Sequence, residues 1–160
     1  MSYQSAYSRK EWVRAVNMSA VLGWSCIALP FVFEMGVSIL PFAAFLGLPL
    51  AFLVCWVFVA PILKRLMRRP ISLPMAAIWG AITSLTIASV FITLGRFRGW
   101  RQSLDPNTSS QLGGGEFVRS VDGILTPYGW QVLAQNTALF VLFGVGIALT
   151  IRMLIGAGQN

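Results

Sequence analysis

An uncharged apolar stretch, LPMAAIWGAITSLTIASVFITL (residues 73–94), follows shortly after a basic segment, KRLMRR (residues 64–69). Three further apolar stretches of similar length occupy residues 15–33, 42–63 and 132–151. Each is close to the roughly 20 apolar residues that a helix needs to cross the hydrocarbon core of a bilayer. We therefore predict four transmembrane helices, at residues 15–33, 42–63, 73–95 and 132–154.

The composition places the whole chain in the membrane class. Hydrophobic residues make up 56% and charged residues only 11% of the sequence, whereas about a quarter of the residues in soluble domains are charged. We expect an all-α integral membrane protein whose residues 1–160 form one four-helix bundle. The sequence has no histidine, and its two cysteines, Cys26 and Cys55, lie inside the predicted helices. No cofactor, metal site or redox pair is expected from this residue set.

The distribution of basic residues predicts the orientation of the helices. Lysine and arginine are more numerous in residues 1–14, in the 64–72 connection and at the C-terminal end than in the other two connections. Cytoplasmic segments carry such an excess, so we predict that both termini lie in the cytoplasm, in the inner membrane of a bacterium. The basic residues behind the net charge of +7 then set the orientation of the helices and contact the lipid bilayer. No nucleic acid is expected as a partner. The residues with this topological role are Lys64, Arg65, Arg68 and Arg69.

Residues 1–14 interleave aromatic and basic side chains, which is typical of a segment at the membrane interface, and a partner-binding arm is the alternative. Small residues recur every four positions in the third predicted helix and less regularly in the first and fourth. Small side chains let two membrane helices approach closely, either within one subunit or between subunits. The residues expected to pack in this way are Ala76, Gly80, Ser84, Ala88, Ser19, Gly23, Gly144 and Gly146.

Residues 96–131 form the one long connection, and we expect it on the outer side. Its first part, RFRGWRQ, is predicted to extend the third helix, and its middle is rich in glycine and turn-forming residues. Apolar residues at helical spacing over residues 116–125 predict a short amphipathic surface helix. Because loops on rigid scaffolds often carry function, this connection is the candidate surface for a partner. The candidate contact residues are Arg98, Trp100, Arg101, Glu116, Phe117, Arg119 and Asp122.

Ionisable residues are scarce within the predicted helices. Glu34 is the only acidic residue in residues 15–63, so it is the candidate ion or proton site if it lies at membrane depth. Its position after a complete spanning run favours a place in the outer turn, at the level of the lipid headgroups. The other loop acids, Asp105, Glu116 and Asp122, are too dispersed to predict a catalytic pair, and we expect no enzyme activity.

This pattern predicts a function by elimination. We expect a small non-enzymatic subunit or accessory protein of a larger membrane complex, with other integral membrane proteins as partners. One alternative is a small transporter or channel that acts as a homo-oligomer, with Glu34 and the prolines of the first two helices in its path. Another is an exclusion or immunity protein of the kind that phages and plasmids encode.

Overall fold

The computed structural model describes residues 6–105, 107 and 109–158, apart from the side chains of Phe31 and Glu34. The chain is mostly helical, and four helical segments are long and apolar enough to cross a membrane, as predicted. They indicate a multi-pass membrane protein. The four candidate spans are Arg9–Pro30, Val37–Leu66, Leu73–Ser103 and Pro127–Ile155.

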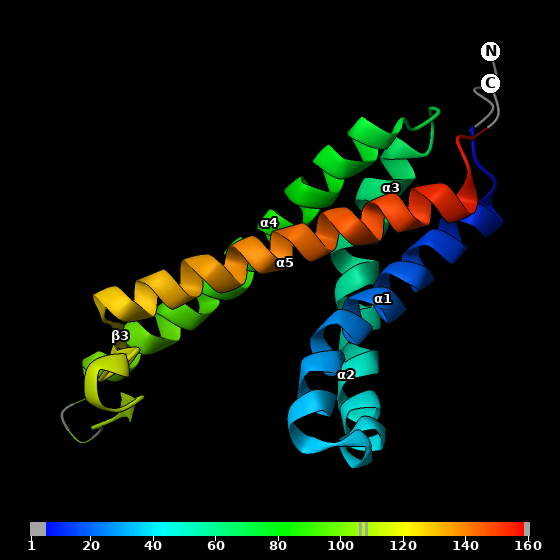
Figure 1. Cartoon of the computed structure of the whole chain (residues 1–160). Helices are drawn as coiled ribbons and strands as arrows, with labels where there is room; N and C mark the ends of the chain where they lie inside the picture. Colours follow the sequence, from blue (N-terminus) through cyan, green and yellow to red (C-terminus); the bar gives the residue numbers. More distant parts are fainter. Residues whose placement is uncertain (1–5, 106, 108, 159–160) are drawn as a thin grey trace. The chain divides into compact units, whose positions relative to one another are not determined.

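The first two spans form a helical hairpin (Figure 1). Helix α1 (Arg9–Met35) starts at a capping box, in which the Ser8 hydroxyl accepts the Glu11 amide and the Glu11 carboxylate accepts the Ser8 amide. It ends at Gly36, whose φ of +81° few other residues adopt. At 27 residues α1 is about 40 Å long, longer than the hydrocarbon core of about 30 Å. Residues 9–14, part of the segment predicted at the membrane interface, form the first turns of this helix.

The second span consists of three consecutive segments. A 3₁₀ turn, η1 (Val37–Ile39), leads into α2 (Leu40–Val54), and α2 continues through a π-helical turn, η2 (Cys55–Val59), into α3 (Ala60–Leu66). Proline lies in the first turn of α2, where its missing N–H costs nothing, as expected for Pro41. Pro61 has no backbone N–H, so it cannot donate a hydrogen bond to a carbonyl of the preceding turn. The wider turn at η2, with the Ala60 amide bonded to the Cys55 carbonyl, lies directly before it.

Two tryptophans of α1 join the hairpin. The Trp24 indole N–H donates to the Ala43 carbonyl at 3.1 Å, and the Trp24 ring lies where a side chain at Gly47 would be. The Trp12 indole N–H donates to the Ala60 carbonyl at 3.1 Å. Each ring therefore fills space against the neighbouring helix and also satisfies its own donor, as buried indoles usually do.

The remaining helices are α4 (Leu73–Ser103) and α5 (Pro127–Ile155). The prediction that RFRGWRQ extends the third spanning helix is confirmed, because α4 continues to Ser103. The chain divides into two compact units, Met1–Thr83 with Phe143–Asn160 and Ser84–Leu142. Each unit contains a part of α4 and a part of α5.

The first unit has its apolar core at the end that holds the chain termini. Tyr7 is buried there, and its hydroxyl donates to the Gly156 carbonyl at 3.1 Å and accepts the Ile71 amide at 3.4 Å. The Arg152 side chain donates to the Ile71 carbonyl. The N-terminal segment, the basic connection and the end of α5 therefore contact one another in this core. The core there comprises Tyr7, Ala15, Met67, Ile71, Ala76 and Ile151.

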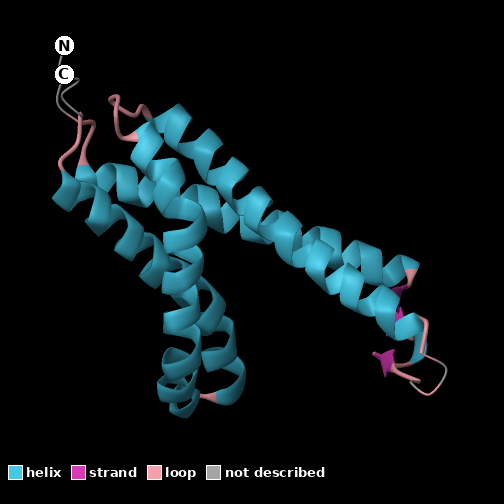
Figure 2. Ribbon diagram, turned by 180° about the vertical axis from the view of Figure 1, so that it is seen from behind, coloured by secondary structure: helices cyan, strands magenta, loops and turns pink. Residues whose placement is uncertain are grey.

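The second unit carries a small antiparallel sheet between the ends of α4 and α5 (Figure 2). Its strands are β1 (Gln111–Leu112), β2 (Ser120–Val121) and β3 (Ile124–Leu125), with a 3₁₀ turn, η3 (Gly115–Phe117), between the first two. The predicted amphipathic helix over residues 116–125 is therefore wrong, and the fold is not purely α-helical. The cause is the pair Asp122 and Gly123, both with positive φ, which turn the chain back after two residues.

Candidate interaction site

Residues 104–126, which we call the cap, connect α4 to α5 within the second unit. The cap is fixed to α4 by a close approach of two glycines. A side chain on Gly99 would collide with the Gly123 carbonyl, and a side chain on Gly123 would collide with the Gly99 carbonyl. Only hydrogen at both positions allows the tip of the β2–β3 hairpin to lie against the helix backbone.

Arg96 holds the same hairpin from the helix side. Its Nη1 donates to the Gly123 carbonyl at 3.2 Å, and its guanidinium lies over the Trp130 ring, 5.5 Å from the ring centre. Arginine pairs well with an aromatic face because the guanidinium is planar and weakly hydrated. One side chain of α4 therefore contacts both the cap and the first turn of α5.

Hydrogen bonds along the backbone close the other side of the cap. The Asp122 amide donates to the Ser110 carbonyl at 2.7 Å, and the Ser110 amide donates to the Asp122 carboxylate at 2.9 Å. The Arg119 amide donates to the Leu112 carbonyl at 2.7 Å. These bonds explain why so short a sheet is ordered, since each links segments separated by several residues.

Thr126 joins the cap to α5. Its hydroxyl accepts the Gly129 amide at 3.0 Å, which is the N-cap interaction of a helix, and donates to the Val118 carbonyl at 2.5 Å. Gly129 is buried, and a side chain there would collide with the Arg119 carbonyl. The hydrogen bonds of Thr126 thus join the start of α5 to the cap.

The strand register gives the sheet an exposed apolar row. Gln111, Val121 and Ile124 are neighbours across the three strands and lie on one face, because side chains alternate along a strand. Val121 and Ile124 are 44% and 45% exposed, although valine and isoleucine are usually buried. The opposite face carries Leu125, which is half-buried and lies against Gly129, and Leu112, which is 61% exposed.

The predicted contact residues are spread over the cap and the end of α4. Arg98, Trp100 and Arg101 are exposed in the last turns of α4, with Trp100 52% exposed. Glu116 and Phe117 lie in the 3₁₀ turn, where the Phe117 and Tyr128 rings pack edge to face with their centres 5.6 Å apart. Asp122 and the backbone of Arg119 instead hold the sheet together. The structure brings the set into one unit but gives its members different roles.

The predicted helix-packing residues also differ in their surroundings. A side chain at Gly80 would collide with Ala148 and with the Gly144 carbonyl, so α4 and α5 touch at these residues. Nothing lies within 4 Å of the same test position at Gly23 or Gly146. Ser19, Ala76 and Ser84 are buried, and Ala88 is half-buried. The Ser19 hydroxyl donates to the Ala15 carbonyl of its own helix at 2.9 Å.

The other predicted positions lie outside the cap. Glu34 belongs to the last turn of α1, but its side chain is outside the described part of the structure. Lys64 and Arg65 occupy the last turn of α3, and Arg68 and Arg69 follow it; all four side chains are exposed. No three metal-ligating side chains lie together among the side chains that the structure describes.

Four residues that hold the cap in place escaped the sequence interpretation. Arg96 was counted only as a charge, Gly123 was considered only as an end of the predicted surface helix, and Gly99 and Thr126 were not singled out. Local signals existed for two of them, because Asp-Gly between apolar residues is typical of a hairpin and Thr-Pro is typical of a helix start. Nothing local marks Arg96 or Gly99, whose partners lie 24 or more residues away.

A scan against protein-family models and searches of curated proteins and of solved structures find no match to this chain.

Proposed function

We propose that the chain is a small non-enzymatic subunit or accessory protein of a larger membrane complex. It lies in a bacterial inner membrane with both termini in the cytoplasm, and its cap contacts a partner protein on the outer side. Helix faces in the membrane provide the second contact.

The exposed row of Val121 and Ile124 carries this proposal. The row lies on a sheet that is fixed to both helices by Gly99, Arg96 and Thr126. Exposed apolar side chains on an ordered surface are typical of protein contacts. A flexible loop would lose more conformational entropy on binding than this preformed surface does.

The membrane helices support the second contact. Only 6% of the most apolar window in the Val37–Leu66 span is buried within the chain, and 28% of that in the Arg9–Pro30 span. Large side chains such as Phe33, Phe45 and Leu53 are more than half exposed. Lipid or neighbouring helices cover this surface in a membrane, and a subunit of a larger complex uses part of it for packing.

The test is co-purification from the native membrane in a mild detergent, followed by mass spectrometry of stoichiometric components. The wild type is compared with a Val121→Thr, Ile124→Thr double variant. Threonine keeps the β-branched shape that suits a strand; its hydroxyl replaces a methyl group of Val121 and the ethyl group of Ile124. Val37→Thr is the control, because Val37 is 69% exposed and lies outside the cap.

We expect a defined partner with the wild type and with Val37→Thr, and its loss with the double variant. Hydrogen exchange at the Ser110 and Arg119 amides checks that the sheet of the double variant is intact. Recovery of the protein alone, as a homo-oligomer, contradicts the subunit proposal. If the partner still co-purifies with the double variant, the exposed row of the cap is not the contact surface.

A further inference from the structure

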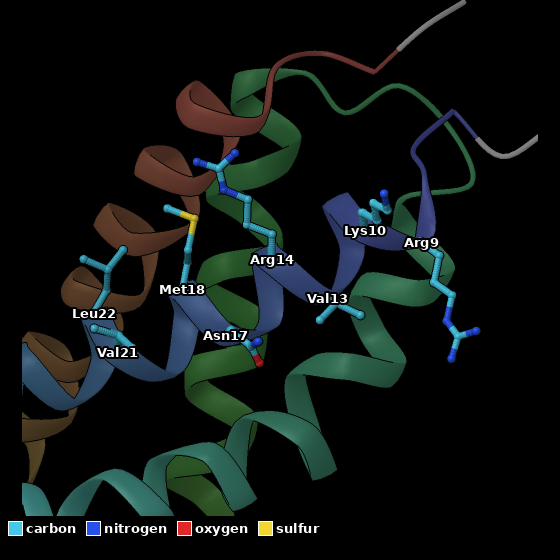
Figure 3. A pocket seen from close by; sticks show the side chains of 8 residues that line it. All are labelled: Arg9, Lys10, Val13, Arg14, Asn17, Met18, Val21 and Leu22. Atoms are coloured by element: carbon cyan, nitrogen blue, oxygen red, sulfur yellow. The ribbon is translucent and has the colours of Figure 1, made fainter.

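A groove lies on one face of the first turns of α1 (Figure 3). Its lining residues are four pairs of neighbours that recur every four positions, so they form a stripe that winds part of the way around the helix. All the residues that line it belong to the membrane-spanning helix α1, and Val21 is 44% exposed.

The chemistry of the lining changes along the groove. Arg9, Lys10 and Arg14 supply three positive charges at its N-terminal end, and all three side chains are exposed. Asn17 follows, and Val21 and Leu22 make the other end apolar. No acidic residue lines the groove among the residues that the structure describes, and the nearby Glu11 carboxylate accepts the Ser8 amide at 2.6 Å. The positive charges therefore have no partner in the lining.

The dimensions of this pattern correspond to those of one membrane leaflet. Arg14, the last basic residue of the lining, and Leu22 are eight helical positions apart, which is about 12 Å along the axis. Half of the hydrocarbon core of a bilayer is about 15 Å thick. The groove thus extends through most of one leaflet when its basic end lies at the headgroup level.

We infer that this groove binds one anionic phospholipid. The phosphate lies between Lys10 and Arg14, the more distant Arg9 adds to the positive charge, and an acyl chain lies along Met18, Val21 and Leu22 (Figure 3). Lysine and arginine at a membrane surface attract anionic lipid, and the unpaired charges here select it over a zwitterionic lipid. This inference is independent of the cap and of any protein partner.

The experiment is native mass spectrometry of the purified protein in micelles that contain a small fraction of phosphatidylglycerol or of phosphatidylcholine. Micelles remove the effect that basic residues have on orientation in a bilayer. The test variant is Arg9→Gln, Lys10→Gln, Arg14→Gln. The control is Lys64→Gln, Arg65→Gln, Arg68→Gln, which removes the same charge from exposed positions outside the groove.

We expect the wild type and the control to retain one phosphatidylglycerol, and the test variant to bind it at least about tenfold more weakly. A further variant, Val21→Trp, fills the apolar part without changing the charge and is also expected to reduce binding. Circular dichroism checks the helix content of every variant.

Four results would overturn the inference. The first three are equal retention of phosphatidylcholine by the wild type, equal loss of phosphatidylglycerol in the control, and unchanged binding in Val21→Trp. Displacement of the lipid by millimolar inorganic phosphate would also overturn it, because the site would then recognise the phosphate alone.

Discussion

Replacing Gly80 with alanine is expected to weaken the packing of α4 against α5. The new Cβ would lie 2.7 Å from the Ala148 Cβ and 2.8 Å from the Gly144 carbonyl oxygen. Carbon atoms pack best at about 3.5–4.0 Å, so the helices must separate by about 1 Å. The atoms in the way belong to the backbone or to a one-carbon side chain, and no rotamer change can relieve the contact.

The size of the effect follows from two opposing terms. Overpacking of this kind costs about 1–3 kcal/mol, whereas alanine in place of glycine favours a helix by about 1 kcal/mol. Gly146→Ala gives the second term alone, because its Cβ would meet no atom within 4 Å. We therefore expect Gly80→Ala to be less stable than Gly146→Ala by about 1–3 kcal/mol.

The assay is reversible unfolding in mixed micelles with a rising fraction of sodium dodecyl sulfate, followed by circular dichroism. The free energy of unfolding is compared among the wild type, Gly80→Ala and Gly146→Ala. If the two variants are equally stable, α4 and α5 do not touch at Gly80 and the packing argument is refuted. Gly80→Leu should then also be tolerated, which gives an independent check.

Three further substitutions test other contacts. Gly47→Ala places a Cβ 2.8 Å from the Trp24 ring and should lower the thermal midpoint in detergent, whereas Gly23→Ala, with no atom within 4 Å, should not. Gly123→Ala introduces a side chain at a φ of +79° and against Gly99, so the cap should become sensitive to protease; equal resistance to that of Gly114→Ala would count against the hairpin. Tyr7→Phe removes the hydrogen bonds of a buried hydroxyl to Gly156 and Ile71, and the free energy of unfolding in mixed micelles should fall by about 1 kcal/mol; an unchanged value would contradict this role of the hydroxyl.

The hairpin of the cap shows why one local prediction was wrong. Phe117, Val121 and Ile124 recur at helical spacing, and that period alone predicts an amphipathic helix. The competing signal was Asp122-Gly123, a dipeptide that favours the two-residue turn of a hairpin. Turn chemistry prevailed over periodicity because the positive φ at both residues ends any helix there.

Arg96 shows a different limit of the sequence. In the sequence RFRGWRQ, Arg96 is recognisable only as one positive charge near the end of a predicted membrane helix. In the structure it is half-buried and contacts the Gly123 carbonyl and the Trp130 ring. Its role depends on residues 27 and 34 positions further along the chain, so no local pattern could reveal it.

The sequence by itself determined that the chain has four helices long and apolar enough to span a membrane, because the bilayer demands long uncharged stretches and leaves few other ways to satisfy the backbone. It also determined that the third of these helices extends into RFRGWRQ. Only the tertiary structure decided which small residues touch, with Gly80 in contact and Gly146 free. It likewise decided that the cap is an ordered sheet and that Tyr7 joins the two ends of the chain. These features rest on contacts between distant residues, and local residue preferences carry no information about them.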